Sequence, residues 1–285
     1  MCVTGPHHHH GPSVDDGGAH GHGLTRRGFL GAATAAVAAG GLAALPFGPP
    51  AAAAATGLVD LTYTFSESFP TFPVFTPAQR RRPYRVETNK FYCQQWELWE
   101  HQGTHLDAPA HFIAGGRMVT QIGLDELVGL PVAVVDISER AGRDADTAVM
   151  AADLESYETA YGRIPDGAAV LMYSGWEQRL AKPGAFVNAG QDGRMHFPGF
   201  SAEAVDWLVA NRNVRGLGVD TLSLDIGRSL EEFPAHVKWL GADKWAMECL
   251  ANVARLPPRG ARLVAAVIPY QEGSGGQVRA FATAA

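Results

Sequence analysis

Three histidines and one aspartate lie within residues 101–111, and they are the residues of this sequence best suited to chemistry. Imidazole and carboxylate groups together bind ions such as Zn²⁺ or Mn²⁺. His101, His105 and Asp107 would leave coordination positions open for water, as in catalytic metal sites. His111 would then be free to exchange protons near neutral pH. The alternative interpretation is that these side chains are hydrogen-bonding loop residues.

The backbone must bend if these ligands are to meet one ion. Positions 101, 105, 107 and 111 share parity, so an extended chain would place their side chains on one face. Gly103 and Pro109 oppose a helix, which favours the extended conformation. At about 3.3 Å per residue, the Cα atoms of His101 and His105 would then lie roughly 13 Å apart. Gly103 is the residue that could form a bulge or turn between them.

The same stretch resembles the signature of the cyclase family, which includes bacterial kynurenine formamidases and the isatin hydrolases. The match consists of His101-x-Gly103-Thr104-His105-x-Asp107-Ala108-Pro109-x-His111-Phe112. Further matches are Asp60-Leu61-Thr62, Phe197-Pro198-Gly199-Phe200-Ser201, residues 218–225, and His236 followed twelve residues later by Glu248. The resemblance therefore covers nearly the whole chain after residue 55.

This resemblance implies roles for individual residues. The first metal would be bound by His101, His105 and Asp107. His236 and Glu248 would complete a second or shared site, and His111 would be the catalytic acid/base. The implied fold is a swivelling β/β/α domain, an α/β class with a mixed sheet, in homodimers or homotetramers. The cofactor would be one or two divalent ions, Zn or Mn.

The loop around Phe72 bears on the substrate. Prolines repeat through residues 69–75, so the segment must be irregular, and its aromatic side chains could line a pocket or cover the core. Kynurenine formamidases of the family carry Trp where this chain has Phe72, which keeps aromatic stacking but loses the indole N–H donor. Phe72 is thus a candidate substrate contact, whereas Glu100, Trp96 and Trp99 resemble the isatin hydrolases more closely.

We therefore predict an enzyme, a metal-dependent amidohydrolase acting on non-peptide C–N bonds. It would open or cleave a small amide or lactam, isatin-like or N-formylkynurenine-like, using a metal-bound hydroxide and His111 as acid/base. One alternative is a secreted protein that binds a metal or small ligand without catalysis. The other is a ring-forming cyclase that uses the same residues.

Residues 1–55 have the features of a twin-arginine export signal. Thr25-Arg26-Arg27-Gly28-Phe29-Leu30 precedes an apolar run to residue 45, and alanines at 51–55 suit cleavage. Cleavage would remove the six histidines of this segment and leave one catalytic domain, residues 56–285. The product would be extracellular or in the cell envelope, without stable membrane association. An uncleaved membrane anchor is the alternative.

The composition of the chain restricts the classes of partner that we expect it to bind. The formal net charge is −6 and the only basic run is Arg80-Arg81-Arg82, which argues against nucleic acid and for a small-molecule partner. Cys93 and Cys249 would be two buried thiols or, alternatively, one disulfide.

Apolar runs and helix-start signals predict alternating strands and helices in the second half of the chain. We expect strands at 57–63, 131–137, 168–173, 214–221 and 262–268, one or two strands within 86–99, and helices at 151–161, 201–209 and 244–253. A short helical piece is expected at 124–128, and residues 273–276 are expected to form a flexible loop. This order predicts a mixed α/β sheet.

Overall fold

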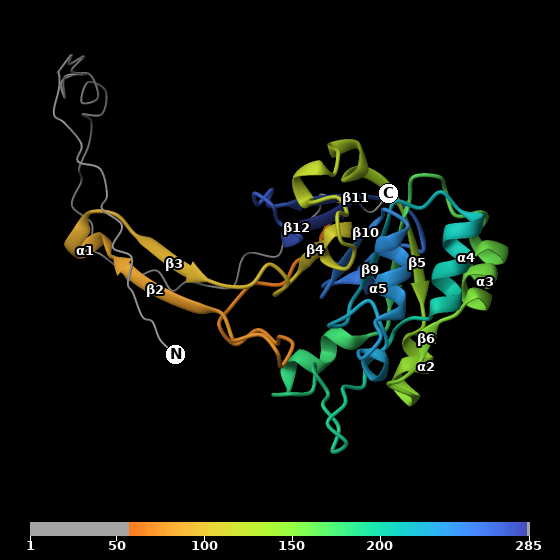
Figure 1. The fold of residues 1–285 in the computed structure, drawn as a ribbon, viewed down its shortest axis with the longest axis horizontal. Coiled ribbons are helices and arrows are strands. Elements are labelled where there is room, and N and C mark those ends of the chain that lie inside the picture. Colours follow the sequence, from red (N-terminus) through yellow and green to blue (C-terminus); the bar gives the residue numbers. More distant parts are fainter. Residues whose placement is uncertain (1–56, 284–285) are drawn as a thin grey trace, which may run out of the picture. The chain divides into compact units, whose positions relative to one another are not determined.

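The structure, a computed structural model, describes residues 57–283. Within this range, eight strands form one mixed sheet in the order β1-β12-β11-β5-β7-β9-β10-β4. Figure 1 labels most of these strands. Their bounds are β1 Leu58–Asp60, β4 His105–Asp107, β5 Val128–Asp136, β7 Ala169–Tyr173, β9 Gly216–Val219, β10 Trp245–Glu248, β11 Arg259–Val267 and β12 Gly275–Thr283. The mixed α/β fold is confirmed.

The sheet is parallel in the middle and antiparallel at both ends. Strands β5, β7, β9 and β10 run parallel, whereas β4, β11, β12 and β1 join through antiparallel pairs. Strand β4 pairs with β10 and also with the first residues of β12, so the last strand of the row joins the second one. The short strand β4, which carries two predicted metal ligands, is therefore held from both sides.

Three helices cover one face of the sheet, α3 Ala151–Tyr161, α4 Ala202–Asn211 and α5 Pro234–Gly241 (Figure 1). The short helix α2 Ser138–Arg143 follows strand β5. Buried residues of α3, α4 and α5 pack with β5, β7 and β9 in one hydrophobic cluster. A second cluster lies on the other side of the sheet, between its central strands and β11 and β12. Strand β10 contributes to both clusters, through Ala246 and Met247, whereas β4 contributes Leu106 to the second one. Both strands are therefore packed into the core of the domain.

A separate arm is formed by β2 Gln79–Tyr84, α1 Val86–Asn89 and β3 Cys93–Glu97. Strands β2 and β3 pair with each other as a two-stranded sheet outside the main one. A third small sheet pairs β6 Ala148–Val149 with β8 Gly199–Phe200. Short 3-10 helices lie at Pro109–His111, Val119–Gln121, Leu124–Glu126, Trp176–Ala181, Gly227–Ser229 and Val253–Arg255.

Most predicted elements are confirmed. The helix at 151–161 has the predicted bounds, and α4 begins after Ser201, whose Oγ accepts the backbone N–H of Ala204 at 3.0 Å. The helix at 244–253 is wrong, because Trp245–Glu248 is strand β10. This run has only four residues, three of them apolar, and its pairing with both β9 and β4 decides its conformation.

Three other expectations need correction. Val86–Asn89 is a helical turn rather than strand, and residues 275–276 begin strand β12 rather than a flexible loop. Both cysteines are free, but only Cys249 is buried, since Cys93 is exposed on the arm. The twin-arginine segment lies outside the described residues. No helix among residues 57–283 is long and apolar enough to cross a membrane.

Candidate metal centre

The predicted ligands on β4 and β10 face each other across one strand pair. His105 lies opposite Glu248 in the antiparallel register, and Asp107 lies opposite Ala246. The extended conformation predicted for residues 101–111 holds only for His105–Asp107, because Pro109–His111 forms a 3-10 helix. Gly103 makes the predicted bend between His101 and His105.

The bend at Gly103 needs glycine for two reasons. Its φ is +71°, a region that residues with a Cβ rarely adopt. A Cβ there would also lie 2.5 Å from Cδ2 of Phe65. The carbonyl of Gly103 accepts a hydrogen bond from Nδ1 of His105 at 2.9 Å, which leaves Nε2 of His105 to face the carboxylates.

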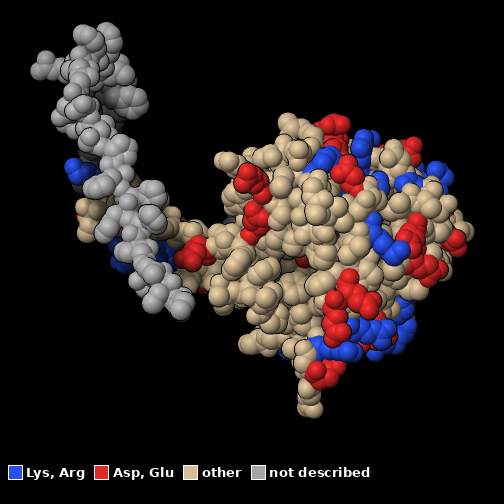
Figure 2. All heavy atoms as spheres, in the orientation of Figure 1, with Lys and Arg blue, Asp and Glu red and all other residues tan. Residues whose placement is uncertain are grey.

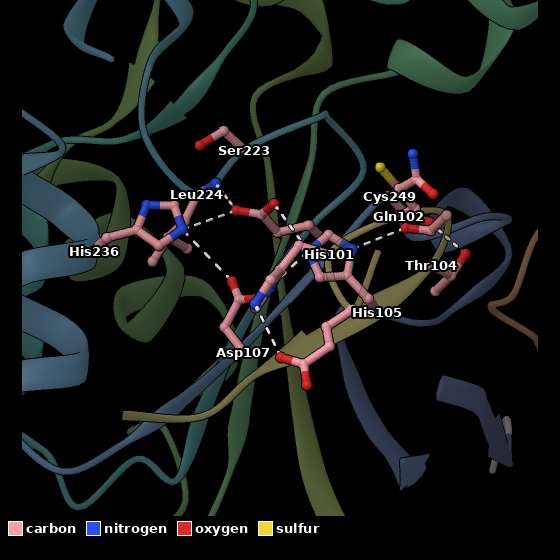
Figure 3. Close-up of polar contacts among 12 residues, drawn as sticks. His101, Gln102, Thr104, His105, Asp107, Ser223, Leu224, His236 and Cys249 are labelled. Carbon is pink, nitrogen blue, oxygen red and sulfur yellow. Dashed lines mark hydrogen bonds and ion pairs between the residues drawn. The ribbon is translucent and has the colours of Figure 1, made fainter. Parts of the chain in front are cut away.

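Asp107 lies at the centre of the cluster. Its Oδ1 is 2.7 Å from Nδ1 of His101 and 3.4 Å from Nε2 of His105, and its Oδ2 is 3.5 Å from Nε2 of His236. Figure 3 shows the three rings pointing toward the Asp107 carboxylate. Strand β4 thus carries two of these four side chains, while His101 comes from the bend before it and His236 from α5.

His236 and Glu248 join this cluster from separate elements. Nε2 of His236 lies 3.0 Å from Oε1 of Glu248, and Nε2 of His105 lies 3.4 Å from Oε2 of the same carboxylate. The backbone N–H of Leu224 donates to Oε1 of Glu248 at 2.7 Å. Both His236 and Glu248 are 3% exposed, so their charges are shielded from water and must be balanced by each other or by a bound ion.

His111 lies beside this cluster rather than within its centre. Its ring stacks on that of His101 with centroids 3.6 Å apart, and it contacts Phe112 edge to face. No hydrogen bond to a ring nitrogen of His111 occurs among the described residues. Burial lowers the pKa of His111 to about 4, so the imidazole is neutral at pH 7 and one ring nitrogen carries a free lone pair.

The electrostatics of the cluster favour positive charge between the two carboxylates. Burial opposes a charged ring at His105, but the carboxylate of Asp107 raises the pKa of His105 to about 10. The neighbouring carboxylates of Asp107, Asp225 and Glu248 raise the pKa of His236 well above its ordinary value, again against the effect of burial. The same histidines hold the pKa of Asp107 and Glu248 low although both are buried.

The residues fit a divalent cation. Oδ2 of Asp107 is buried and has no hydrogen-bond partner among the described residues, which is costly unless something else satisfies it. Two sets of side chains have ligand atoms within 4.8 Å of one another and share Asp107. They are His101, Asp107 and His111, and His105, Asp107 and Glu248. Imidazole nitrogens and carboxylate oxygens are the ligands that Zn²⁺ and Mn²⁺ accept.

A cavity of about 130 Å³ opens beside the cluster. The candidate ligands His101, His236 and Glu248 form part of its wall together with His111. The rest of the lining is Phe72, Val74, Phe75, Phe112, Ser223 and Phe233. The cavity thus joins an aromatic wall to the candidate metal ligands. On the face that Figure 2 shows, acidic and basic side chains are interspersed over the outer surface.

Comparison with known proteins gives the family. The cyclase family profile matches residues 59–226, which is more than half of the chain. The chain belongs to the cyclase family.

Several proteins similar to this chain are named as enzymes. Isatin hydrolase of Roseibium aggregatum is 33% identical over 200 residues, which cover 67% of this chain and 75% of the relative. Kynurenine formamidase of Geobacillus thermodenitrificans is 25% identical over 224 residues, covering 78% and 95%. The solved structure of isatin hydrolase A from Ralstonia solanacearum is 36% identical, with a TM-score of 0.74, covering 79% and 90%. The predicted enzyme class is confirmed: the chain is a hydrolase of the cyclase family.

The structure brings together all the site residues predicted from the sequence, namely His101, His105, Asp107, His111, His236, Glu248 and Phe72. Sequence reasoning missed three features of the site: Asp225 behind His236, Ser274 beside His101, and the contribution of Phe112 and Phe233 to the cavity. The sequence did contain a signal for Asp225, because an aspartate next to apolar residues that are expected to be buried requires a partner.

Proposed function

We propose that this member of the cyclase family is a metal-dependent hydrolase of a small amide or lactam. The observation that carries the proposal is the position of Asp107. Its carboxylate faces three imidazoles, and its buried Oδ2 accepts no hydrogen bond from residues 57–283. The cluster borders a cavity whose wall also includes His111. A site with open metal positions next to an unligated base is suited to hydrolysis rather than to structural metal binding.

The ion would be held by His105, Asp107 and Glu248, with His236 and His101 beside them. The two sets that share Asp107 would accommodate either one ion or two. Zn²⁺ and Mn²⁺ are the candidates, since both accept imidazole and carboxylate ligands. A bound divalent ion would supply an acidified water and stabilise negative charge on the substrate carbonyl oxygen.

His111 carries the proton transfer in this proposal. Its neutral ring, placed on the cavity wall, accepts the proton from the attacking water and returns it to the nitrogen of the broken C–N bond. The carbonyl carbon gains the water oxygen and the nitrogen leaves as an amine, so the products are a carboxylate and an amine. Stacking on His101 holds the His111 ring in place for both transfers.

The cavity favours a small, flat, largely apolar substrate. Its volume of about 130 Å³ is below the roughly 300–1,000 Å³ of sites that hold drug-sized ligands. Phe72 and Phe75 meet edge to face at 6.5 Å, and Phe75 stacks on Trp99. A bicyclic aromatic lactam such as isatin suits this aromatic wall better than the flexible chain of N-formylkynurenine, for which Phe72 offers no N–H donor.

Metal analysis together with two hydrolysis assays tests the proposal. Purified protein should contain about one or two equivalents of Zn or Mn and should hydrolyse isatin faster than N-formylkynurenine. Tight binding of these compounds without hydrolysis would support a non-catalytic binding protein, and ring closure of the amino-acid product would support a ring-forming enzyme. Protein that binds no divalent ion would contradict the proposal.

We also propose that residues 1–55 direct twin-arginine export and are removed, leaving the catalytic domain in the cell envelope or outside the cell. The twin arginines and the apolar run after them support this. Replacing Arg26 and Arg27 together by lysine should retain the protein in the cytoplasm at its full length. Export of the lysine variant would contradict the proposal.

A second copy of this chain is the proposed partner of the β2–β3 arm, in a homodimer or homotetramer. Every residue from 81 to 93 is exposed, including the apolar side chains of Tyr84, Val86, Phe91 and Tyr92. An isolated two-stranded sheet is only marginally stable in water, so the arm needs a cover. Residues 79–97 carry a net charge of +3 within a chain of net −6, which favours docking on the acidic remainder of another copy.

A further inference from the structure

Ser274 and Glu100 lie directly behind the imidazole of His101. Oγ of Ser274 is 3.0 Å from Nε2 of His101 and 2.7 Å from Oε2 of Glu100. The backbone N–H of Ser274 donates to the same carboxylate oxygen at 3.0 Å. On its other side, the His101 ring presents Nδ1 to Asp107. His101 therefore stands between a carboxylate–hydroxyl pair and the centre of the candidate metal site.

The hydrogen-bond directions in this chain follow from the groups themselves. An ionised carboxylate has no proton to give, so the hydroxyl of Ser274 donates to Glu100. Its lone pairs then face Nε2 of His101, which must carry a proton to donate to them. The 2.7 Å contact between Nδ1 and Asp107 is itself a hydrogen bond in which only Nδ1 can donate. A divalent ion bound there would replace this proton, so that the ring keeps its proton on Nε2 alone and directs the Nδ1 lone pair at the ion.

The position of the ring is fixed on its remaining sides as well. A Cβ on Gly275 would lie 2.3 Å from Cε1 of His101, so the ring packs directly against glycine backbone. The ring of His111 covers His101 at a centroid distance of 3.6 Å. Gly275 opens strand β12 and pairs with Asp107 of β4, which fixes Ser274 relative to the metal site. The imidazole has little room to rotate.

We infer that Glu100 and Ser274 form a positioning pair that selects the Nε2–H form of His101 and presents its Nδ1 to the metal. The inference rests on the proposed function, because it concerns a ligand of the proposed ion. It goes beyond that function in assigning a role to two residues outside the ligand set. Partners that hold a ligating histidine commonly contribute about 10- to 100-fold to metal affinity.

The test compares Ser274→Ala with Ser156→Ala, a matched change at an exposed position of α3. Zn²⁺ affinity is measured by competition with a chelator, independently of turnover. Ser274→Ala should bind Zn²⁺ about 10- to 100-fold more weakly, Ser156→Ala should match the wild type, and Ser274→Thr should recover most of the affinity because it keeps the hydroxyl. Glu100→Gln should weaken binding, whereas Glu97→Gln on the exposed arm should not.

Nitrogen-15 NMR of the Zn²⁺-loaded protein supplies a readout that a merely structural role would not change. The wild type should show a slowly exchanging proton on Nε2 of His101. Ser274→Ala should lose this signal, while the rest of its spectrum remains that of a folded protein. Unchanged Zn²⁺ affinity and an unchanged His101 signal in Ser274→Ala would overturn the inference. Wild-type protein that binds no Zn²⁺ or Mn²⁺ would instead overturn the proposed function, so the two failures are distinguishable.

Discussion

Nδ1 of His236 lies 2.6 Å from Oδ2 of Asp225, and both side chains are buried. Asp225 also accepts the backbone N–H groups of Ala235 and His236, at 2.6 and 3.1 Å, at the start of helix α5. The carboxylate thus fixes the ring of His236 and the first turn of its helix together, so that Nε2 points to Glu248. A carboxylate behind a histidine raises the basicity of the ligating nitrogen.

Asp225→Asn should therefore weaken metal binding without unfolding the protein. The amide keeps the shape and can accept one of the N–H groups, but it removes the negative charge behind His236. We expect about 10- to 100-fold lower Zn²⁺ affinity, measured by chelator competition. Asp206→Asn is the matched control, because Asp206 pairs with Lys238 on the surface. Equal affinities in the two variants would show that Asp225 does not act on the ligand.

Phe72→Trp should change which substrate is preferred. The larger ring keeps the aromatic wall of the cavity and adds an N–H donor. The ratio of kcat/KM for N-formylkynurenine to that for isatin should rise relative to the wild type, with metal content unchanged. Phe72→Leu keeps an apolar side chain without a donor and should lower both activities without raising the ratio. A ratio that does not differ between the Trp and Leu variants would exclude Phe72 as a specificity residue.

Gly103→Ala should damage both stability and metal binding. The substitution combines a φ of +71° with a Cβ only 2.5 Å from Phe65. Gly129 provides the control, since its φ is +73° but nothing lies within 4 Å of a Cβ there. Gly129→Ala should cost about 1–3 kcal/mol from backbone strain alone, whereas Gly103→Ala should cost more and lose Zn²⁺ affinity. Urea denaturation and chelator competition measure the two effects.

Replacing the exposed aromatics of the arm should lower the oligomeric state. Tyr84 and Phe91 have ring centroids 4.8 Å apart and expose 43% and 51% of their surface. The double substitution Tyr84→Ser with Phe91→Ser should convert a dimer or tetramer into smaller species in light scattering. Val128→Ser, another exposed apolar position but on the main sheet, should leave the mass unchanged. A wild-type protein that is monomeric in solution would contradict the proposal that the arm docks on a second copy of the chain.

Much of the fold could be predicted because local patterns and tertiary structure agree. The helix at 151–161 and the capped helix after Ser201 have strong local signals. Strand β10 could not be predicted in this way. A run of three apolar residues followed by Glu248 has no clear period, and its conformation is decided by β9 and β4, which are distant in the sequence.

The candidate site likewise combines residues that the sequence predicts with residues that it does not. The ligands between His101 and His111 are close in sequence, so spacing alone revealed them. His236 and Glu248 became candidates only through resemblance to the cyclase family, since an isolated histidine or glutamate has no distinctive pattern. Ser274 was hidden because a Gly-Ser-Gly-Gly segment is typical of a flexible loop, whereas pairing of β12 with β4 orders it here.

The central claim is that the cluster around Asp107 holds the ion while His111 transfers protons. His111 also belongs to one of the two possible ligand sets, so its role must be decided by separating metal content from turnover. The most direct measurement is the metal content and single-turnover rate of isatin hydrolysis in His111→Gln, with His105→Ala alongside. We predict that His111→Gln keeps its metal and loses about 10²- to 10⁴-fold in rate, and that His105→Ala loses both. A metal-free His111→Gln protein, or one that turns over at the wild-type rate, would contradict the account.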